Sequence, residues 1–138
     1  MEKTLMHTCC APCSVACIHQ LRSEGIEPVS YWFNPNIHPY QEYKARRDTL
    51  MAYAPTIGMA LIVQEDYGLR DFCSAVAGDI DHRCGHCYTV RLEQTARFAA
   101  EASAPDSRRP VSWAFTCRNT AAACSARRSG IKSRSSGI

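Results

Sequence analysis

The sequence predicts an α/β fold in which helices cover a parallel, Rossmann-like sheet. Short apolar segments typical of strands alternate with longer amphipathic segments typical of helices from residue 4 to about residue 102. The first strand, helix and second strand together occupy about 30 residues, which is the length of a βαβ unit. At 138 residues the chain is long enough for one hydrophobic core but not for two full domains.

The first βαβ unit is expected over residues 4–33. Residues 4–8 (TLMHT) predict a short strand, which leads into a helix beginning near Pro12, a favoured residue at helix starts. The apolar stripe of this helix is expected to contain Val15, Ile18 and Leu21. Gly25 fits the left-handed position just after the helix. Residues 28–33 are rich in β-branched and aromatic side chains and predict the second strand.

The α/β alternation continues after this unit. Pro39 predicts a helix from about Tyr40, and Pro55 is expected to end or kink it before Gly58. Its core-facing residues are expected to be Tyr43, Leu50, Met51 and Ala54. The remaining elements are a strand over residues 60–63, a short helix over 69–77, a polar loop over 78–85 and a longer helix over 87–102. This last helix is expected to bury Leu92, Ala96 and Ala99.

The charge distribution divides the chain into two parts. Residues 1–101 carry a net charge of −3 and residues 102–138 one of +6, so overall basicity does not indicate that the body binds nucleic acid. Residues 103–138 contain 8 Ser and 6 Arg and show no sustained period. We therefore expect a Rossmann-like domain over residues 1–102 and a basic tail over 103–138, either disordered or read out of frame.

The cysteine content indicates the chemistry. No apolar run approaches the roughly 18 residues of a membrane span, and the start lacks the apolar core of a secretory signal. We therefore expect a cytoplasmic protein with no membrane partner. In that reducing compartment, nine cysteines indicate metal binding or thiol chemistry more than structural disulfides.

The cysteines form two clusters, each expected where a strand or loop meets a helix. Cys9, Cys10 and Cys13 follow the first strand, and Cys84 and Cys87 lie where the polar loop meets the longer helix. In a doubly wound sheet such junctions meet at the carboxyl edge, where helix N-termini lower thiol pKa values. The remaining cysteines are Cys17, next to the first cluster, and the scattered Cys73, Cys117 and Cys124, which are expected to be ordinary thiols.

Adjacent cysteines distinguish between candidate metal centres. The side chains of Cys9 and Cys10 are expected to diverge and to share one tetrahedral zinc ion only under strain, whereas a multi-iron cluster presents several binding points. A [4Fe-4S] cluster held by Cys9, Cys10, Cys84 and Cys87 therefore fits the spacing, with Cys13 as a spare thiol, a second metal ligand or a redox partner. A structural zinc site and a thioredoxin-like dithiol at Cys10 and Cys13 stay open as alternatives.

Three segments resemble, in the same order, the epoxyqueuosine reductases of the QueH family. They are HTCCAPCS at residues 7–14, YWFNPNIHPYQEYKARRDTL at 31–50 and RCGHCYTVRLEQTARFAAE at 83–101. The resemblance covers residues 1 to about 101. It implies a Rossmann-like fold of the adenine nucleotide alpha hydrolase type and a cluster bound by Cys9, Cys10, Cys84 and Cys87, with room for a second metal ion.

The resemblance also implies a reaction and its partners. Members of this family reduce epoxyqueuosine to queuosine at the wobble position of tRNA, the last step of queuosine biosynthesis, and the electron donor is unidentified here. They continue after the FAAE segment with further helices and strands and a C-terminal redox cysteine pair. This chain has neither, and Cys117 and Cys124 are not assigned that role, so we expect the iron–sulfur domain over residues 1–102 to be incomplete. If the later elements are needed to complete the sheet or pass electrons, the chain is expected to be unstable or inactive.

Several further residues are candidates for catalysis or RNA binding. The catalytic residue is unassigned, with Cys13 as one candidate. The proton donor is sought among His7, His38, His86 and Asp48. The cations expected to be exposed and to contact RNA phosphates are Lys44, Arg46, Arg47, Arg91 and Arg97. The aromatic residues that fit a stacked base are Tyr31, Trp32, Phe33 and Tyr40. Because Trp32 and Phe33 lie in an expected strand, they fit the core better. A zinc-stabilised RNA-binding module without catalysis is the remaining alternative.

Overall fold

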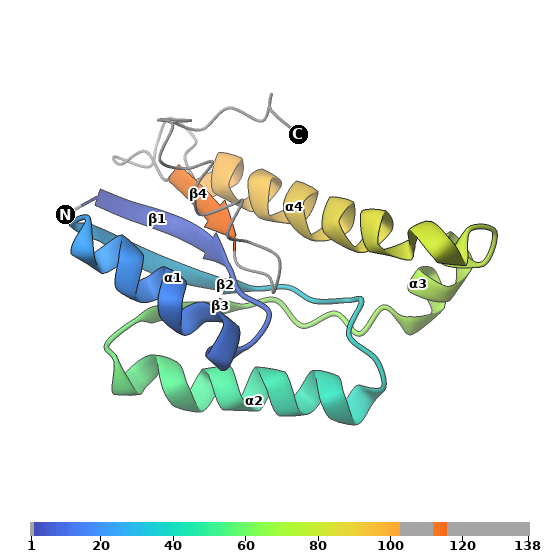
Figure 1. The fold of residues 1–138 in the computed structure, drawn as a ribbon, viewed down its shortest axis with the longest axis horizontal. Helices are drawn as coiled ribbons and strands as arrows, with labels where there is room; N and C mark the ends of the chain where they lie inside the picture. The colour runs from blue at the N-terminus through green and yellow to red at the C-terminus, as the bar shows by residue number, and fades with distance from the viewer. Residues whose placement is uncertain (1, 103–111, 116–138) are drawn as a thin grey trace.

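Four parallel strands form one sheet in the computed structural model, which describes residues 2–102 and 112–115 (Figure 1). The strands are β1 (Glu2–His7), β2 (Ile26–Trp32), β3 (Ala60–Val63) and β4 (Ser112–Phe115), in the spatial order β3-β2-β1-β4. The α/β fold with a parallel sheet is thus confirmed. The first three strands end at the same edge of the sheet, and the loops that follow them carry the candidate site.

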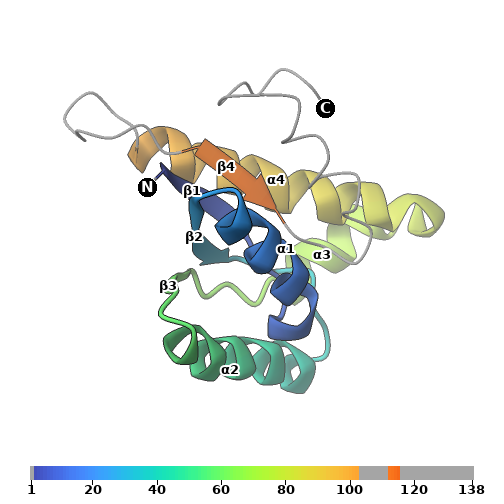
Figure 2. The same cartoon turned by 60° about the vertical axis from the view of Figure 1, so that its left-hand side comes forward.

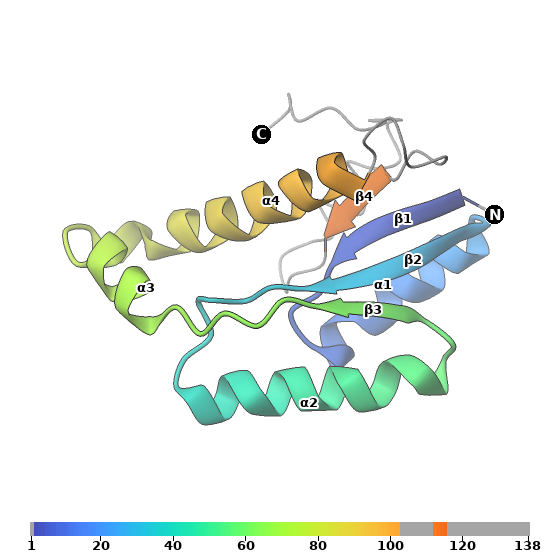
Figure 3. The ribbon, with the colours of Figure 1, turned by 180° about the vertical axis from the view of Figure 1, so that it is seen from behind.

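Helices cover both faces of the sheet. They are α1 (Ala11–Ser23), α2 (Tyr40–Thr56), α3 (Leu69–Val76) and α4 (Arg83–Ala102), with a short 3₁₀ turn η1 (Ile80–His82) before α4. Figure 2 shows α1 and α2 on one face and α4 on the other. Seen from behind in Figure 3, α3 packs beside the start of α4, beyond the strand ends. Among the described helices, none has the length and apolar character that a bilayer crossing requires.

The sheet has a hydrophobic core on each face, and neighbouring residues of the central strands contribute to opposite cores. Met6 and Trp32 pack with α1 and α2, whereas Leu5 and Tyr31 pack with α4. Successive side chains of a strand point to opposite faces, so a strand covered on both sides reads as a continuous apolar run. Trp32 also contacts Tyr43 of α2 edge to face, with ring centroids 4.8 Å apart.

Two residues expected in the core lie outside it. Val15 of α1 is 42% exposed and Met51 of α2 is 48% exposed, so both assignments are wrong. In α1 the buried face contains Ser14, whose hydroxyl donates to the Ala11 carbonyl at 2.8 Å and is thereby satisfied. Apolar character alone therefore misplaces the buried stripe. Ala96 of α4 is half-buried, while Ile18, Leu21, Tyr43, Leu50, Ala54, Leu92 and Ala99 are buried as expected.

Helix boundaries follow the local sequence closely. Gly25 has φ 75°, the left-handed conformation expected after α1. Helix α2 ends at Thr56, one residue after Pro55 and before Gly58, which has φ 62°. The expected polar loop over residues 78–85 is shorter than predicted, because α4 begins at Arg83 and already includes Cys84.

Strand β4 lies in the segment for which no regular element was predicted. Its four residues pair with β1, Leu5 opposite Trp113, and extend the sheet on the side away from β2. A strand this short within serine- and arginine-rich sequence leaves no periodic pattern to detect. Residues 103–111 and 116–138, with Cys117 and Cys124, lie outside the described part of the chain. The domain boundary at residue 102 therefore stays a prediction.

Candidate metal centre

Three cysteine sulfurs converge where β1 leads into α1. The Sγ atoms of Cys9, Cys10 and Cys13 all lie within 4.8 Å of one another, and those of Cys9 and Cys10 are 3.8 Å apart. Two thiolates bound to one zinc ion at about 2.3 Å in a tetrahedron also lie about 3.8 Å apart. Cys9 is buried and the other two are half-buried. The three sulfurs can therefore hold a metal.

This arrangement contradicts the expected divergence of adjacent cysteine side chains. The chain bends at Cys9, and Cys10 is extended, with φ −163° and ψ 162°, as the N-cap residue of α1. The bend brings both sulfurs to the same side. Adjacency in the sequence is therefore no argument against a shared zinc ion in this protein.

Buried hydrogen bonds from β2 and the loop after it hold the bend in place. The amide of Thr8 donates to the Tyr31 carbonyl at 2.9 Å, and the side-chain amide of Asn34 donates to the Thr8 carbonyl at 3.0 Å. The indole N–H of Trp32 donates to the Cys9 carbonyl at 3.3 Å. These bonds fix the backbone that positions the first two sulfurs.

A cavity of about 420 Å³ opens onto the three sulfurs. Its lining includes Asn36, Glu42, Thr49 and two arginines, Arg46 and Arg91. Arg46 is paired with Glu42 at 2.6 Å. The N-terminus of α1, which has no side-chain hydrogen bond to cap it, also faces this region. Positive charge beside the sulfurs stabilises an anionic metal–thiolate centre.

Of the two arginines that line this cavity, Arg91 is the buried one. Only 7% of it is exposed, its Nε donates to the Cys87 carbonyl at 3.0 Å, and its guanidinium lies 5.2 Å from the centre of the Tyr88 ring. Within the described residues no carboxylate pairs with it. Burying a cation is costly unless an anion compensates it. The cysteine sulfurs of the same cavity can supply that negative charge.

The second cysteine pair lies outside the group of three converging sulfurs. Cys87 is half-buried and Cys84, three residues earlier in α4, is exposed. Cys87 is nevertheless linked to the sulfur cavity, because Asn36 and Arg91 line that cavity and both act on its thiol. Burial raises the pKa of Cys87, and the charge of Arg91 and a hydrogen bond from Asn36 act in the opposite direction.

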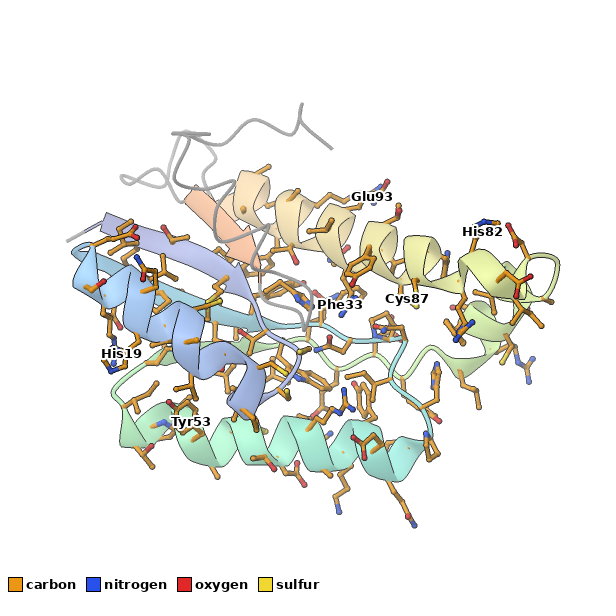
Figure 4. The ribbon with its side chains drawn as sticks, viewed as in Figure 1. His19, Phe33, Tyr53, His82, Cys87 and Glu93 are labelled. Carbon is orange, nitrogen blue, oxygen red and sulfur yellow. The ribbon has the colours of Figure 1, made fainter. Side chains whose placement is uncertain are left out.

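A second cavity, of about 290 Å³, lies on the other side of Asn36. Figure 4 labels two of its lining residues, Phe33 after β2 and Cys87 on α4. The remaining lining residues are Pro35, Asn36, Asp66, Gly68, Asp71, Phe72, Ala75, His86 and Val90. Sequence reasoning missed Asn36, Asp66 and Phe72. Asn36 and Asp66 follow β2 and β3 at the carboxyl edge, a position that could have identified them.

The four proton-donor candidates occupy different environments. His7 is buried and its Nε2 is 2.9 Å from the Phe33 carbonyl, which indicates a structural role. Asp48 is exposed and paired with Arg47 at 3.1 Å, and it lines neither cavity described above. His38 packs against two aromatic rings, and burial lowers its pKa. His86 lines the second cavity beside Cys87 and is best placed of the four.

The residues expected to contact RNA differ in how exposed they are. Lys44 and Arg97 are exposed, whereas Arg91 is buried and wrongly expected at the surface. Arg47 is engaged by Asp48 and Glu65. Trp32 and Phe33 are buried, as the core interpretation requires. Tyr31 is buried as well, and Tyr40 is 48% exposed.

Comparison with known proteins assigns the chain to a family. A model of the family described as epoxyqueuosine reductase QueH matches residues 4–107. A relative of this name from Dehalococcoides mccartyi is 35% identical over 98 residues, which cover 71% of this chain and 54% of the relative. A relative from Histophilus somni is 34% identical, and the aligned part covers 75% of this chain and 44% of the relative. A relative from Haemophilus influenzae is also 34% identical, with 71% of this chain and 42% of the relative covered.

The chain thus spans about half the length of these relatives. The matched residues include all three segments that the sequence analysis singled out, together with most of β1, the elements from α1 to α4 and both cysteine clusters. The family match extends over more than half of the chain. This protein belongs to the epoxyqueuosine reductase QueH family.

Proposed function

We propose that the protein reduces epoxyqueuosine to queuosine in tRNA, in the cytoplasm, at an iron–sulfur centre held by Cys9, Cys10, Cys84 and Cys87. The observation that carries this proposal is the convergence of cysteine sulfurs at the carboxyl edge of the sheet, beside a buried arginine. The family name supports the reaction and the tRNA substrate.

The residues present fit an anionic metal–thiolate centre. Cys9 and Cys10 offer sulfurs on one side of the cavity, and Cys87 is linked to it through Asn36. Cys84 and Cys87 are separated by two residues, the spacing that lets both sulfurs reach one centre. When bound, such a cluster supplies electrons one at a time to a reaction that removes the epoxide oxygen as water with two electrons and two protons.

The protein's own residues bind, orient and neutralise charge. Arg91 compensates the thiolates from within the cavity, and Asn36 orients Cys87 by hydrogen bonding its sulfur. Lys44 and Arg97, which are exposed, are available to phosphates of the tRNA. His86, which lines the second cavity beside Cys87, is the proposed proton donor.

A turnover assay tests this function. The full chain, reconstituted anaerobically with iron and sulfide, is mixed with tRNA that contains epoxyqueuosine and with dithionite, and the nucleosides are separated after digestion. We expect queuosine to form with the wild-type protein and with Cys73→Ser, whose thiol is exposed on α3, but not with Cys9→Ser. A cooperatively melting, cluster-containing protein that makes no queuosine would contradict the proposal.

A zinc site is a second candidate, favoured by the 3.8 Å separation of the Cys9 and Cys10 sulfurs. In that case Cys13 supplies a third ligand and the site stabilises an RNA-binding module. Metal analysis of the purified protein separates the two: one zinc ion without sulfide supports the second candidate, and iron with sulfide supports the first.

A further inference from the structure

A pair of thiols at the start of α1 is only half used by the proposed cluster. The motif CAPC at residues 10–13 places Cys10 at the N-cap of α1 and Cys13 two residues into the helix after Ala11. Both are thiols in the structure, and both belong to the group whose sulfurs lie within 4.8 Å of one another. The cluster proposal takes Cys10 as a ligand and leaves Cys13 beside it. Two thiols this close can react with each other as well as with a metal.

Backbone geometry selects which two of the three converging thiols can join. Cys9 and Cys10 are connected by a trans peptide bond, so their Cα atoms are about 3.8 Å apart, whereas an unstrained disulfide needs roughly 4.4–6.8 Å. A bond between these neighbours would be strained. Cys10 and Cys13 have the two-residue gap of Cys-X-X-Cys redox motifs, which are typical of helix N-termini.

The cavity of about 420 Å³ gives a small oxidant access to this pair. Cys10 and Cys13 line the cavity and are half-buried, whereas Cys9, which also lines it, is buried. Among the described lining residues, two arginines stand against one glutamate, so positive charge prevails. A small anionic disulfide, such as oxidised glutathione, is therefore attracted to the cavity.

We propose that Cys10 and Cys13 form a reversible disulfide by exchange with a small anionic disulfide of the glutathione type. One protein thiol, as its thiolate, attacks a sulfur of the oxidant, which forms a mixed disulfide and releases one glutathione thiolate. The second protein thiolate then displaces the other glutathione. The two protein thiols lose two electrons and two protons, and one oxidant disulfide becomes two thiols.

This disulfide acts as a redox switch on the metal centre. Cys10 is a ligand in both metal candidates, the iron–sulfur cluster and the zinc ion, and its sulfur cannot hold a metal while it is bonded to Cys13. A thiol reductant restores the site. Disulfides in reducing compartments are mostly transient and redox-sensing, which matches a reversible bond here. The effect on metal rests on the proposed function, whereas formation of the bond does not.

Mass spectrometry of the metal-free full chain tests the bond. The protein is equilibrated without oxygen in mixtures of oxidised and reduced glutathione, denatured in acid and alkylated, and the tryptic peptide of residues 4–22 is weighed. This peptide contains Cys9, Cys10, Cys13 and Cys17. We expect it to lose two hydrogen atoms and to take up two alkyl groups.

Single variants identify the partners. Cys10→Ser and Cys13→Ser should each form no internal disulfide and should carry a mixed disulfide with glutathione instead. Cys17→Ser, at a half-buried position of α1 outside the converging group, is the matched control and should keep the bond, as should Cys9→Ser. Absence of an internal disulfide in the wild-type protein, or a bond that persists in Cys13→Ser, would overturn the inference.

Zinc alone serves as the probe of the switch, measured by competition with a chelating dye in the absence of thiol reductant. The reduced protein should bind zinc at least about tenfold more tightly than the oxidised protein, and a thiol reductant should restore binding to the oxidised sample. Equal zinc affinity of the two forms would overturn the switch. A Cys10–Cys13 bond in a protein whose reduced form binds neither zinc nor iron would refute the proposed metal centre but not the bond.

Discussion

A short chain of buried hydroxyl groups is expected to determine the stability of the turn that carries the sulfurs. Ser30 of β2 donates to Thr8 Oγ1 at 2.7 Å, and Thr8 donates in turn to the Met6 carbonyl at 3.3 Å. Thr8 and Ser30 are both 0% exposed. Thr8→Val preserves the shape of the side chain but leaves the Ser30 hydroxyl without its acceptor.

The magnitude follows from these contacts. A stranded buried hydroxyl costs about 1–3 kcal/mol, and the longer bond to Met6 adds less than about 1 kcal/mol. We therefore expect Thr8→Val to lower the free energy of unfolding by about 2–3 kcal/mol and Ser30→Ala by about 1 kcal/mol. The double variant strands no hydroxyl and should lose about 1.5 kcal/mol, so the coupling energy is about 2 kcal/mol.

Urea denaturation of the four proteins measures this cycle. With a slope of about 2 kcal/mol per molar urea, the midpoint of Thr8→Val should fall by about 1 M with the slope unchanged. The double variant should be more stable than Thr8→Val alone. Strictly additive losses, or a Thr8→Val midpoint equal to that of the wild type, would refute the hydrogen-bond chain as the stabilising feature.

Three further predictions concern charge, pH and the core. Arg91→Met should weaken iron retention about tenfold in chelator competition, because the thiolates lose a buried counter-charge. Arg91→Lys keeps the charge and should retain most of the iron. Equal iron retention in the two variants would contradict a charge-compensating role for Arg91. Burial lowers the pKa of His38 below 6.5, so the unfolded chain binds a proton that the folded chain does not, and thermal stability should fall as the pH drops below about 6.5. His38→Phe should show a smaller fall, and an unchanged pH profile would be evidence against this cause. Leu50→Ala should lower the free energy of unfolding by about 2–5 kcal/mol, because Leu50 is fully buried. Met51→Ala, at an exposed position, should lower it by about 0.5 kcal/mol or less. Similar losses in the two variants would contradict the orientation of α2.

Local patterns were sufficient to predict the strands and α-helices that precede residue 102, although α4 begins earlier than expected and η1 was not predicted. The strand over residues 60–63 was located to the residue, and Gly25 and Gly58 mark helix ends because their positive φ angles suit glycine. These features depend on neighbouring residues in the sequence. Val15 and Met51 were misplaced because the rotation of a helix against a sheet depends on distant residues such as Trp32, which the local period does not contain.

The site was predictable in position but not in geometry. The carboxyl edge of the parallel sheet brings the first cysteine cluster to a functional position, as topology requires. The convergence of Cys9 and Cys10 depends on a bend held by Trp32 and Asn34, which lie more than twenty residues away in the sequence. The burial of Arg91 is likewise a tertiary property, because an arginine on a helix reads as a surface cation until its neighbours are known.

The central claim is that one inorganic cluster joins the two cysteine pairs, Cys9 with Cys10 and Cys84 with Cys87. Iron and sulfide analysis after anaerobic reconstitution tests this claim most directly. The wild-type protein should bind about four iron and four sulfide per chain and absorb broadly near about 400 nm.

The second pair is the decisive one, because its sulfurs lie outside the group that converges in the structure. Cys84→Ser and Cys87→Ser should each lose the cluster, and Cys73→Ser should retain it as the matched control. A single zinc ion that is retained by Cys84→Ser and Cys87→Ser but released by Cys13→Ser would contradict the shared cluster.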